Sequence, residues 1–316
     1  MALRTTEQRH SASSTLDSMP PEAALTAMCD GQIAAAYAVR AAIPQIAEAA
    51  ETIARCLRAG GRLIYAGAGS SGLMALADGL EIPVTFGVPR EQIVIRLSEG
   101  VETIADFATE TEDDSQRGQN DMHALGITEK DCLIALSASG TTPYAVAALR
   151  AAKESGAATI AIANNPGAPL LDLADTAIHL DTPPEIVAGS TRLGAATAQK
   201  IALNMISTQV GIHLGHVHDG YMVNMRATNI KLRDRARRMV SAITGCDEQT
   251  AADSFARSEG STKIAVLLAS GADSPETARA MLQQSGDVLR HALQQLHASQ
   301  ASNRKAPEGA PIGASR

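Results

Sequence analysis

One stretch constrains the fold of this chain more than any other. Residues 60–72 comprise a glycine pair, a short apolar segment and a loop of glycines and serines, Gly60-Gly61-Arg62-Leu63-Ile64-Tyr65-Ala66-Gly67-Ala68-Gly69-Ser70-Ser71-Gly72. An apolar, helix-compatible run follows at 73–77, so the order predicts a strand, a tight turn and the start of a helix. Such a turn leaves backbone N–H groups for an anion, and the hydroxyls of Ser70 and Ser71 add donors. The alternative is a tight turn without a ligand.

A second loop of the same kind follows a predicted buried strand at 132–136. Its sequence is Ser137-Ala138-Ser139-Gly140-Thr141-Thr142-Pro143, and a helix is predicted next, since Pro143 suits a first helical turn. Because ligands of parallel sheets bind beyond the carboxyl ends of the strands, both loops can grip one phosphate. The expected contacts in this loop are Ser137, Ser139, Thr141 and Thr142. Neither loop has the lysine of a P-loop, which favours a small phosphate ester over a nucleoside triphosphate.

Strands and helices alternate through the middle of the chain. We expect strands at 63–66, 93–97, 133–136, 159–163 and 177–180, separated by helices at 72–79, 104–107 with 115–125, 143–155 and 169–174. This alternation predicts an α/β fold with a doubly wound parallel sheet. Two helices precede it between residues 21 and 59, and Ile33, Ala36 and Tyr37 fall on one face of the first.

Four regions are expected along the chain. They are an N-terminal segment with helices at 1–59, a phosphate-binding domain at 60–228, a small helical domain at 229–296 and a disordered tail at 297–316. A long helix is predicted over about 192–214. Three short helices are predicted within 235–296, with joints at 244–247, 258–260 and 271–275. The tail mixes Pro, Gly, Ala and charged residues, a composition typical of disorder.

The amino-acid composition and net charge limit the kinds of partner and the cellular location that we expect. The net charge is −7 and the 316 residues include no Trp and 2% aromatics, so we expect no nucleic-acid partner. No apolar run approaches the ~20 residues of a membrane span. The four cysteines are not spaced as a metal or redox pair, which suits a reducing cytoplasm. The cluster of His213, His216 and His218 suggests a possible metal site. Gly215 is expected to end a helix between them, which would separate their rings, so no metal is predicted.

Several runs resemble one family in order along the chain. The two loops resemble the sugar isomerase (SIS) phosphosugar-binding fold, and longer runs resemble its N-acetylmuramic acid 6-phosphate etherase branch, over roughly residues 6–293. Those runs lie at 60–72, 81–87, 112–118, 137–144, 189–193, 197–200, 203–205 and 229–232. The resemblance implies a flavodoxin-like SIS domain, a homodimer and no cofactor. It implies a lyase that cleaves the D-lactyl ether of N-acetylmuramic acid 6-phosphate by elimination and hydration, in cell-wall sugar recycling.

The resemblance also implies a catalytic pair, Glu81 and Glu112. One carboxylate removes the proton beside the sugar aldehyde carbon, and the other protonates the departing lactate oxygen. It assigns Glu81 as the acid and Glu112 as the base, with the order open to exchange. From the residues alone, Glu81 lies in a turn, because Pro83 favours an extended Ile82. Glu112 lies in an acidic run, which is typical of a solvated face or a helix N-terminus.

Three further polar residues are candidates beyond the loops. Isomerases of the SIS fold carry a base near the position of Glu185, which otherwise suits a helix N-terminus. Ser190 and Thr191 suit a helix cap or a sugar-binding edge.

The chain departs from the etherase pattern at three cations. Leu73, Thr141 and Gly194 stand where the family usually has Arg, Arg and Lys. Two alternatives therefore remain, namely a paralogue that isomerises another sugar phosphate and a phosphosugar-sensing regulator without catalysis. The N-terminal pattern Thr6-Glu7 and Leu16-Asp17 also matches the family and predicts a segment folded over a neighbour, or else a disordered leader.

Overall fold

The computed structural model describes residues 4–101 and 109–305, so the predicted helix at 104–107 lies outside the described residues. The chain divides into two compact units. The first comprises residues 1–84 and 88–213, and the second comprises 85–87 and 214–316. In the described ranges, no helix is both long and apolar enough to pass through a membrane.

The first unit contains a parallel sheet. Its strands are β1 (Leu63–Gly67), β2 (Ile93–Leu97), β3 (Cys132–Ser137), β4 (Ala158–Ala163) and β5 (Thr176–His179). Their spatial order is β2-β1-β3-β4-β5, and all neighbours pair in parallel. The prediction of a doubly wound parallel α/β sheet is confirmed. The strand order reverses between β1 and β3, which is the point where such sheets bind ligands.

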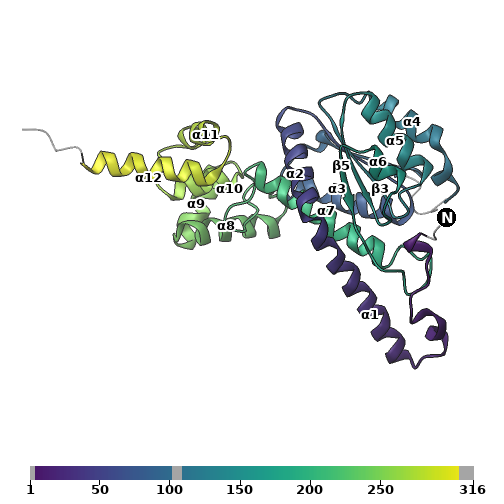
Figure 1. The fold of residues 1–316 in the computed structure, drawn as a ribbon. Coiled ribbons are helices and arrows are strands. Elements are labelled where there is room, and N and C mark those ends of the chain that lie inside the picture. The colour runs from purple at the N-terminus through teal and green to yellow at the C-terminus, as the bar shows by residue number, and fades with distance from the viewer. Residues whose placement is uncertain (1–3, 102–108, 306–316) are drawn as a thin grey trace, which may run out of the picture. The chain divides into compact units, whose positions relative to one another are not determined.

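Helices cover both faces of the sheet (Figure 1). On one face lie α4 (Ser115–Ala124), α5 (Pro143–Glu154) and α6 (Pro169–Leu173). Ile64 and Leu133 point into that layer and pack with Ala148 and Leu149 of α5. The opposite face carries α2 (Ile43–Arg58), α3 (Gly69–Thr85) and α7 (Gly194–His213), and α1 (Pro21–Ala38) packs on α7. The strands are buried on both sides, as their continuous apolar character requires.

The course of α3 corrects one prediction. The sequence places Glu81 in a turn before Pro83, but α3 continues to Thr85 with Pro83 inside it. Pro83 lies in the last turn, so it removes a helical hydrogen bond only near the frayed end of the helix. Ile82 and Pro83 are buried, and that apolar burial offsets the lost bond.

A buried carboxylate holds α3 against its neighbours. Asp78 accepts hydrogen bonds from the Tyr65 hydroxyl of β1 at 2.8 Å and, on α7, from Asn204 at 2.8 Å and Ser207 at 2.9 Å. Burial raises the pKa of Asp78, although these donors lower it in part. The three donors satisfy a group whose burial is otherwise costly, and they tie the helix that starts at the first loop to the sheet.

The second unit is helical. Its helices are α8 (Ile230–Thr244), α9 (Glu248–Arg257), α10 (Thr262–Ala269), α11 (Pro275–Gln284) and α12 (Leu289–Lys305). They enclose a core that includes Val240, Phe255, Val266 and Leu282. The described part of this unit thus has five helices, and the prediction of three is wrong. The missed turn contains Gly286 and Asp287, which both have positive φ, and Lys263 donates to the Asp287 carbonyl at 2.8 Å.

The last helix also differs from the expected tail. α12 runs to Lys305, whereas the sequence predicts a disordered tail from residue 297. The Gln300 side chain donates to the Ser270 carbonyl at 3.1 Å, and Leu296 is buried just before it. These contacts hold the polar end of α12 on its own unit. Residues 306–316 lie outside the described residues.

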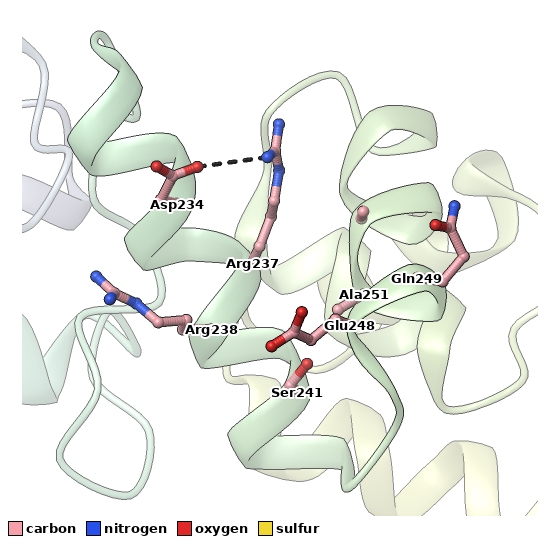
Figure 2. A pocket seen from close by; sticks show the side chains of 8 residues that line it. Asp234, Arg237, Arg238, Ser241, Glu248, Gln249 and Ala251 are labelled. Carbon is pink, nitrogen blue, oxygen red and sulfur yellow. Dashed lines mark hydrogen bonds and ion pairs between the residues drawn. The ribbon is translucent and has the colours of Figure 1, made fainter.

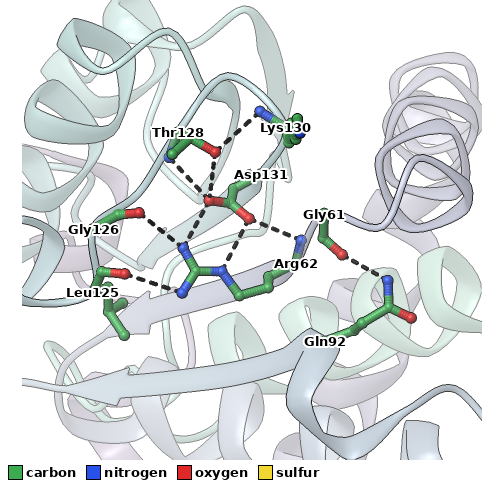
Figure 3. Close-up of polar contacts among 8 residues, drawn as sticks. All are labelled: Gly61, Arg62, Gln92, Leu125, Gly126, Thr128, Lys130 and Asp131. Atoms are coloured by element: carbon green, nitrogen blue, oxygen red, sulfur yellow. Dashed lines mark hydrogen bonds and ion pairs between the residues drawn. The ribbon is translucent and has the colours of Figure 1, made fainter.

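An ion pair joins the residues that precede β1 and β3, at the amino ends of the two strands. Figure 3 shows its contacts. The Arg62 guanidinium donates to both Asp131 oxygens, at 3.0 and 2.8 Å, and to the carbonyls of Leu125 and Gly126. Asp131 also accepts from the backbone N–H groups of Arg62 and Thr128 at 2.9 Å. Burial alone would raise the pKa of Asp131. The hydrogen bonds from Arg62 and Thr128 and the charge of Arg62 lower it by more, so this pKa lies below its ordinary value.

Replacing Asp131 tests the contribution of this pair to stability. Asp131→Asn is expected to lower the free energy of unfolding at pH 7 by about 1–3 kcal/mol, because the Arg62 donors lose a charged acceptor. The wild-type advantage is fully present above the unfolded-state pKa of about 3.9 and is lost as the pH falls through the lower folded-state value. Urea unfolding between pH 7 and pH 3 measures this. The exposed Asp181→Asn is the control, and equal effects of both changes would contradict the assignment.

Candidate functional site

The two glycine and serine loops lie side by side. β1 and β3 are adjacent and parallel, and Gly67 is paired with Leu136 at their carboxyl ends. The loops at 67–72 and 137–142 therefore leave the same edge of the sheet, which confirms that expectation. The first loop leads directly into α3, so Ser70, half-buried, and Ser71, buried, lie in the first turn of that helix.

The second loop is a compact cluster of hydroxyls. The Ser137 hydroxyl lies 3.2 Å from that of Ser139 and 2.8 Å from that of Thr142. Ser139 accepts from the Thr141 backbone N–H at 3.2 Å and from the Thr141 hydroxyl at 3.1 Å. The structure thus brings together all four predicted side chains of this loop at the start of α5. Hydroxyls and a helix N-terminus together favour an anion.

Gly140 makes the shape of this loop possible. Its φ is +69°, and a Cβ at this position would lie 2.3 Å from the Cβ of Ala168. Leu170 also donates its backbone N–H to the Gly140 carbonyl at 3.1 Å. Only glycine combines the left-handed backbone with this close approach to the loop after β4.

Glu112 lies against the first loop. A Cβ built on Gly69 would be 2.5 Å from the Glu112 Oε1, so the carboxylate occupies the space beside that glycine. The Thr111 hydroxyl contacts the Ser98 hydroxyl at 3.3 Å, and Ser98 donates its backbone N–H to the Gly67 carbonyl at 3.1 Å. Burial raises the pKa of Glu112, and the nearby carboxylates of Glu99 and Asp113 raise it further. Glu112 is thus a half-buried carboxyl with a raised proton affinity beside the anion-binding loops.

Glu81 does not join Glu112 within one chain. Glu81 is exposed near the far end of α3. At 1.5 Å per residue, it lies about 18 Å along the helix axis from Gly69, beside which the Glu112 carboxylate lies. Two exposed apolar residues of the same helix, Leu80 and Val84, lie next to it. A single chain therefore contains both predicted carboxylates but does not assemble them as a pair.

Sequence analysis missed the residue that ties the N-terminal segment to the site. Asn165, in the loop after β4, donates to the Thr6 hydroxyl at 3.0 Å and to the carbonyls of Ala138 and Ser139, and it accepts from the Thr6 N–H at 3.2 Å. Thr6 is buried, so residues around it fold onto their own chain rather than form a disordered leader. The signal in the sequence is the Asn164-Asn165 pair directly after a predicted strand.

Glu185 acts as a helix cap in this structure. It is buried, and its two oxygens accept from the backbone N–H groups of Gly194 at 2.9 Å and Ala195 at 2.8 Å. Both oxygens are occupied, so the geometry fits the alternative of a charge at a helix N-terminus. Ser190 and Thr191 are half-buried just before α7, and Gly189 donates to the Thr6 carbonyl at 3.2 Å. The N-terminal segment thus links this region to the second loop.

A hollow of about 490 Å³ lies beside the second loop. The described residues that line it come from the N-terminal segment, the second loop and the loop after β4: Arg4, Thr5, Gln8, Ser139, Thr141, Asn165, Pro166, Gly167, Ala168 and Pro169. Its size suits a small molecule. The lining combines the apolar side chains of Pro166, Ala168 and Pro169 with hydroxyls, two amides and one cation.

The second unit has a separate hollow of about 380 Å³ between α8 and α9 (Figure 2). Side chains of both charges line it, and Arg237 pairs with Asp234 at 3.3 Å. This mixture does not select a ligand of one charge. Across the described ranges, no group of three or more His, Cys, Asp or Glu side chains could hold a metal ion. The Nε2 atom of His218 lies 3.5 Å from the Asp219 Oδ2, and the Nε2 atom of His216 lies 3.8 Å from the Asp287 Oδ2.

Gly140 offers a direct test of the second loop. Gly140→Ala is expected to destabilise the protein by about 1–3 kcal/mol, because the methyl group must displace Ala168. Gly126→Ala is the matched control, since Gly126 also has positive φ but has no atom within 4 Å of an added Cβ. Thermal unfolding of both variants separates the close approach from backbone strain. Equal destabilisation would show that the contact with Ala168 is unimportant.

Comparison with known proteins agrees with this geometry. A family model described as SIS domain matches residues 34–164. The chain is 44% identical to an N-acetylmuramic acid 6-phosphate etherase of Deinococcus radiodurans, with 92% of this chain and 95% of that protein covered. Proteins of the same name from Mycolicibacterium smegmatis and a Geobacillus species are 42% and 39% identical, with 90% and 92% of this chain and 95% and 98% of theirs covered. This chain therefore belongs to the N-acetylmuramic acid 6-phosphate etherase family.

Proposed function

We propose that this protein cleaves the D-lactyl ether of N-acetylmuramic acid 6-phosphate and yields N-acetylglucosamine 6-phosphate and D-lactate. The observation that carries the proposal is the 44% identity to a named etherase over 92% of the chain. Such a lyase serves the recycling of cell-wall sugars. The cytoplasmic location expected from the sequence remains a prediction.

The phosphate group is assigned to the two loops at the edge of the sheet. In this proposal, Ser70 and Ser71 contribute from the start of α3, and Ser137, Ser139, Thr141 and Thr142 from the start of α5. Support comes from the shared edge of β1 and β3 and from the clustered hydroxyls. Two helix N-termini add favourable dipoles for a phosphate ester.

The mechanism proposed is elimination followed by hydration. Opening of the sugar ring gives an aldehyde, which acidifies the proton on the adjacent carbon. Glu112 as base removes that proton, an acid protonates the lactate oxygen as the carbon–oxygen bond breaks, and water then adds to the unsaturated aldehyde. The raised pKa of Glu112, caused by burial and by Glu99 and Asp113, makes it a stronger base than an exposed carboxylate.

We propose that the acid, Glu81, is supplied by the second subunit of a homodimer. Within one chain, Glu81 is exposed and about 18 Å along α3 from the glycine that Glu112 contacts. Leu80 and Val84 beside it are 44% and 48% exposed. Covering these apolar side chains with a second copy would also bury Glu81 in the contact between the subunits.

The first helix supports the same dimer. Leu25, Ile33 and Tyr37 of α1 are 63%, 48% and 64% exposed, and Ala35 is the buried residue of this helix. Large apolar side chains gathered on one exposed helix are typical of an interface between subunits. The face with Ile33 and Tyr37 that the sequence analysis noted is therefore assigned to the partner subunit.

The activity is tested by incubating the pure protein with N-acetylmuramic acid 6-phosphate and assaying lactate. In deuterated water, elimination and hydration should place deuterium on the carbon next to the aldehyde. Glu112→Gln keeps the shape of the side chain and removes the base, so the rate should fall about 10²–10⁴-fold. Glu154→Gln, on an exposed position of α5, is the control. No lactate from the wild type, or product without deuterium, would contradict the proposal.

Mixed dimers test whether the pair is formed between subunits. Glu81→Gln and Glu112→Gln are each expected to be inactive as homodimers. Denaturing and refolding an equal mixture should restore about a quarter of the wild-type activity, because half the dimers are hybrids and each hybrid has one intact site. If both carboxylates act within one chain, no site in any hybrid is intact and the mixture stays inactive.

A further inference from the structure

We infer that Arg4, in the N-terminal segment, binds the phosphate group of the sugar phosphate next to the second loop. Arg4 lines the 490 Å³ hollow together with Ser139 and Thr141, which belong to the hydroxyl cluster at the start of α5. Of the described residues that line this hollow, Arg4 is the only charged one. The hollow is thus lined by one cation, three hydroxyl-bearing residues and a helix N-terminus, a combination that suits a phosphate ester.

The backbone of Arg4 is fixed by its own turn. Its carbonyl accepts from the N–H groups of Glu7 at 2.9 Å and Gln8 at 3.1 Å, within the short 3-10 helix η1 (Thr5–Glu7). The Arg4 side chain is exposed, so the charged group is accessible to a ligand. Arg4 therefore reaches the hollow from a structured segment. This segment precedes the sheet by some sixty residues of sequence, so the motifs around the two loops do not include Arg4.

The segment itself is attached to the site from two directions. Thr6 is 3% exposed and pairs through its backbone N–H and its hydroxyl with Asn165, which also donates to the carbonyls of the second loop. On the other side, Gly189 donates to the Thr6 carbonyl, and the Ser13 hydroxyl donates to the Ile186 carbonyl at 2.8 Å. These contacts place Arg4 relative to Ser139 through one shared side chain, Asn165. The N-terminal segment is thus a wall of the binding site.

A cation here supplies what the loops lack. In both loops, the side chains offered to an anion are neutral hydroxyls, whereas a phosphate dianion is held more tightly by a guanidinium, which can donate two parallel hydrogen bonds. Thr141, next to Gly140, is neutral in this chain and lines the same hollow as Arg4. Arg4 compensates for that neutral position from a different part of the chain.

The inference rests on the proposed function for the identity of the substrate, but binding tests it separately. Arg4→Gln, Arg4→Lys and the exposed control Arg90→Gln are compared with the wild type by calorimetry, with N-acetylglucosamine 6-phosphate and N-acetylglucosamine as probes. We expect Arg4→Gln to weaken binding of the phosphorylated sugar about 10-fold, as for a hydrogen-bonded charge at a partly solvated site. Arg4→Lys should lose less, and Arg90→Gln should match the wild type.

Turnover of N-acetylmuramic acid 6-phosphate separates phosphate from lactyl recognition. If Arg4 binds phosphate, Arg4→Gln raises KM by the same factor by which it weakens binding of N-acetylglucosamine 6-phosphate, and kcat changes little. A loss confined to the lactyl-bearing sugar would assign Arg4 to the lactyl carboxylate and overturn the inference. Unchanged binding, or an equal loss in Arg90→Gln, would also overturn it. Wild-type protein that binds the phosphosugar in an Arg4-dependent way but releases no lactate would refute the proposed activity and leave this inference intact.

Discussion

The parallel pairing of β1 with β3 is the interaction on which the rest of the site depends. Hydrogen bonds between these strands bring Gly67 opposite Leu136, so two loops that are seventy residues apart in sequence leave the sheet together. Each loop then begins a helix, α3 or α5, and each helix directs its N-terminus at the same region. An anion held there interacts with two helix dipoles and with hydroxyls of both loops. Without this pairing, neither loop would be more than a tight turn.

Buried polar contacts then fix what the strand pairing brings together. Asp78 joins α3 to β1 and α7 through three donors, and Asn165 joins the second loop to Thr6. Each of these groups is costly to bury without partners, so each contact specifies one arrangement of the elements. The carboxylate of Glu112 lies beside Gly69, in space that a side chain at position 69 would need. The result is a site whose acidic group is half-buried and has a raised pKa.

The two predicted carboxylates illustrate how the fold changes a sequence interpretation. Pro83 suggested a turn at Glu81, because proline disfavours helix at the preceding residue. In the structure, burial of Ile82 and Pro83 outweighs that local preference, and α3 carries Glu81 to the end of the helix away from Glu112. The interpretation of Glu185 also changes. The sequence makes it a candidate base, whereas in the structure it caps a helix and both of its oxygens accept hydrogen bonds. Tertiary contacts, rather than residue type, decided the role available to each carboxylate.

The sequence alone determined the strands, their alternation with helices and the two loops, because hydrophobic runs, glycines and hydroxyls are local signals of buried strands and turns. It also determined the family, through motifs spread in order along most of the chain. Only the tertiary structure decided that the N-terminal segment lies on the second loop, that Glu81 and Glu112 are separate within one chain, and that the second unit has an additional turn at Gly286 and Asp287. These features depend on contacts between residues far apart in sequence. The pattern of neighbouring residues reports local backbone preference and burial, and it contains no information about which distant residues meet.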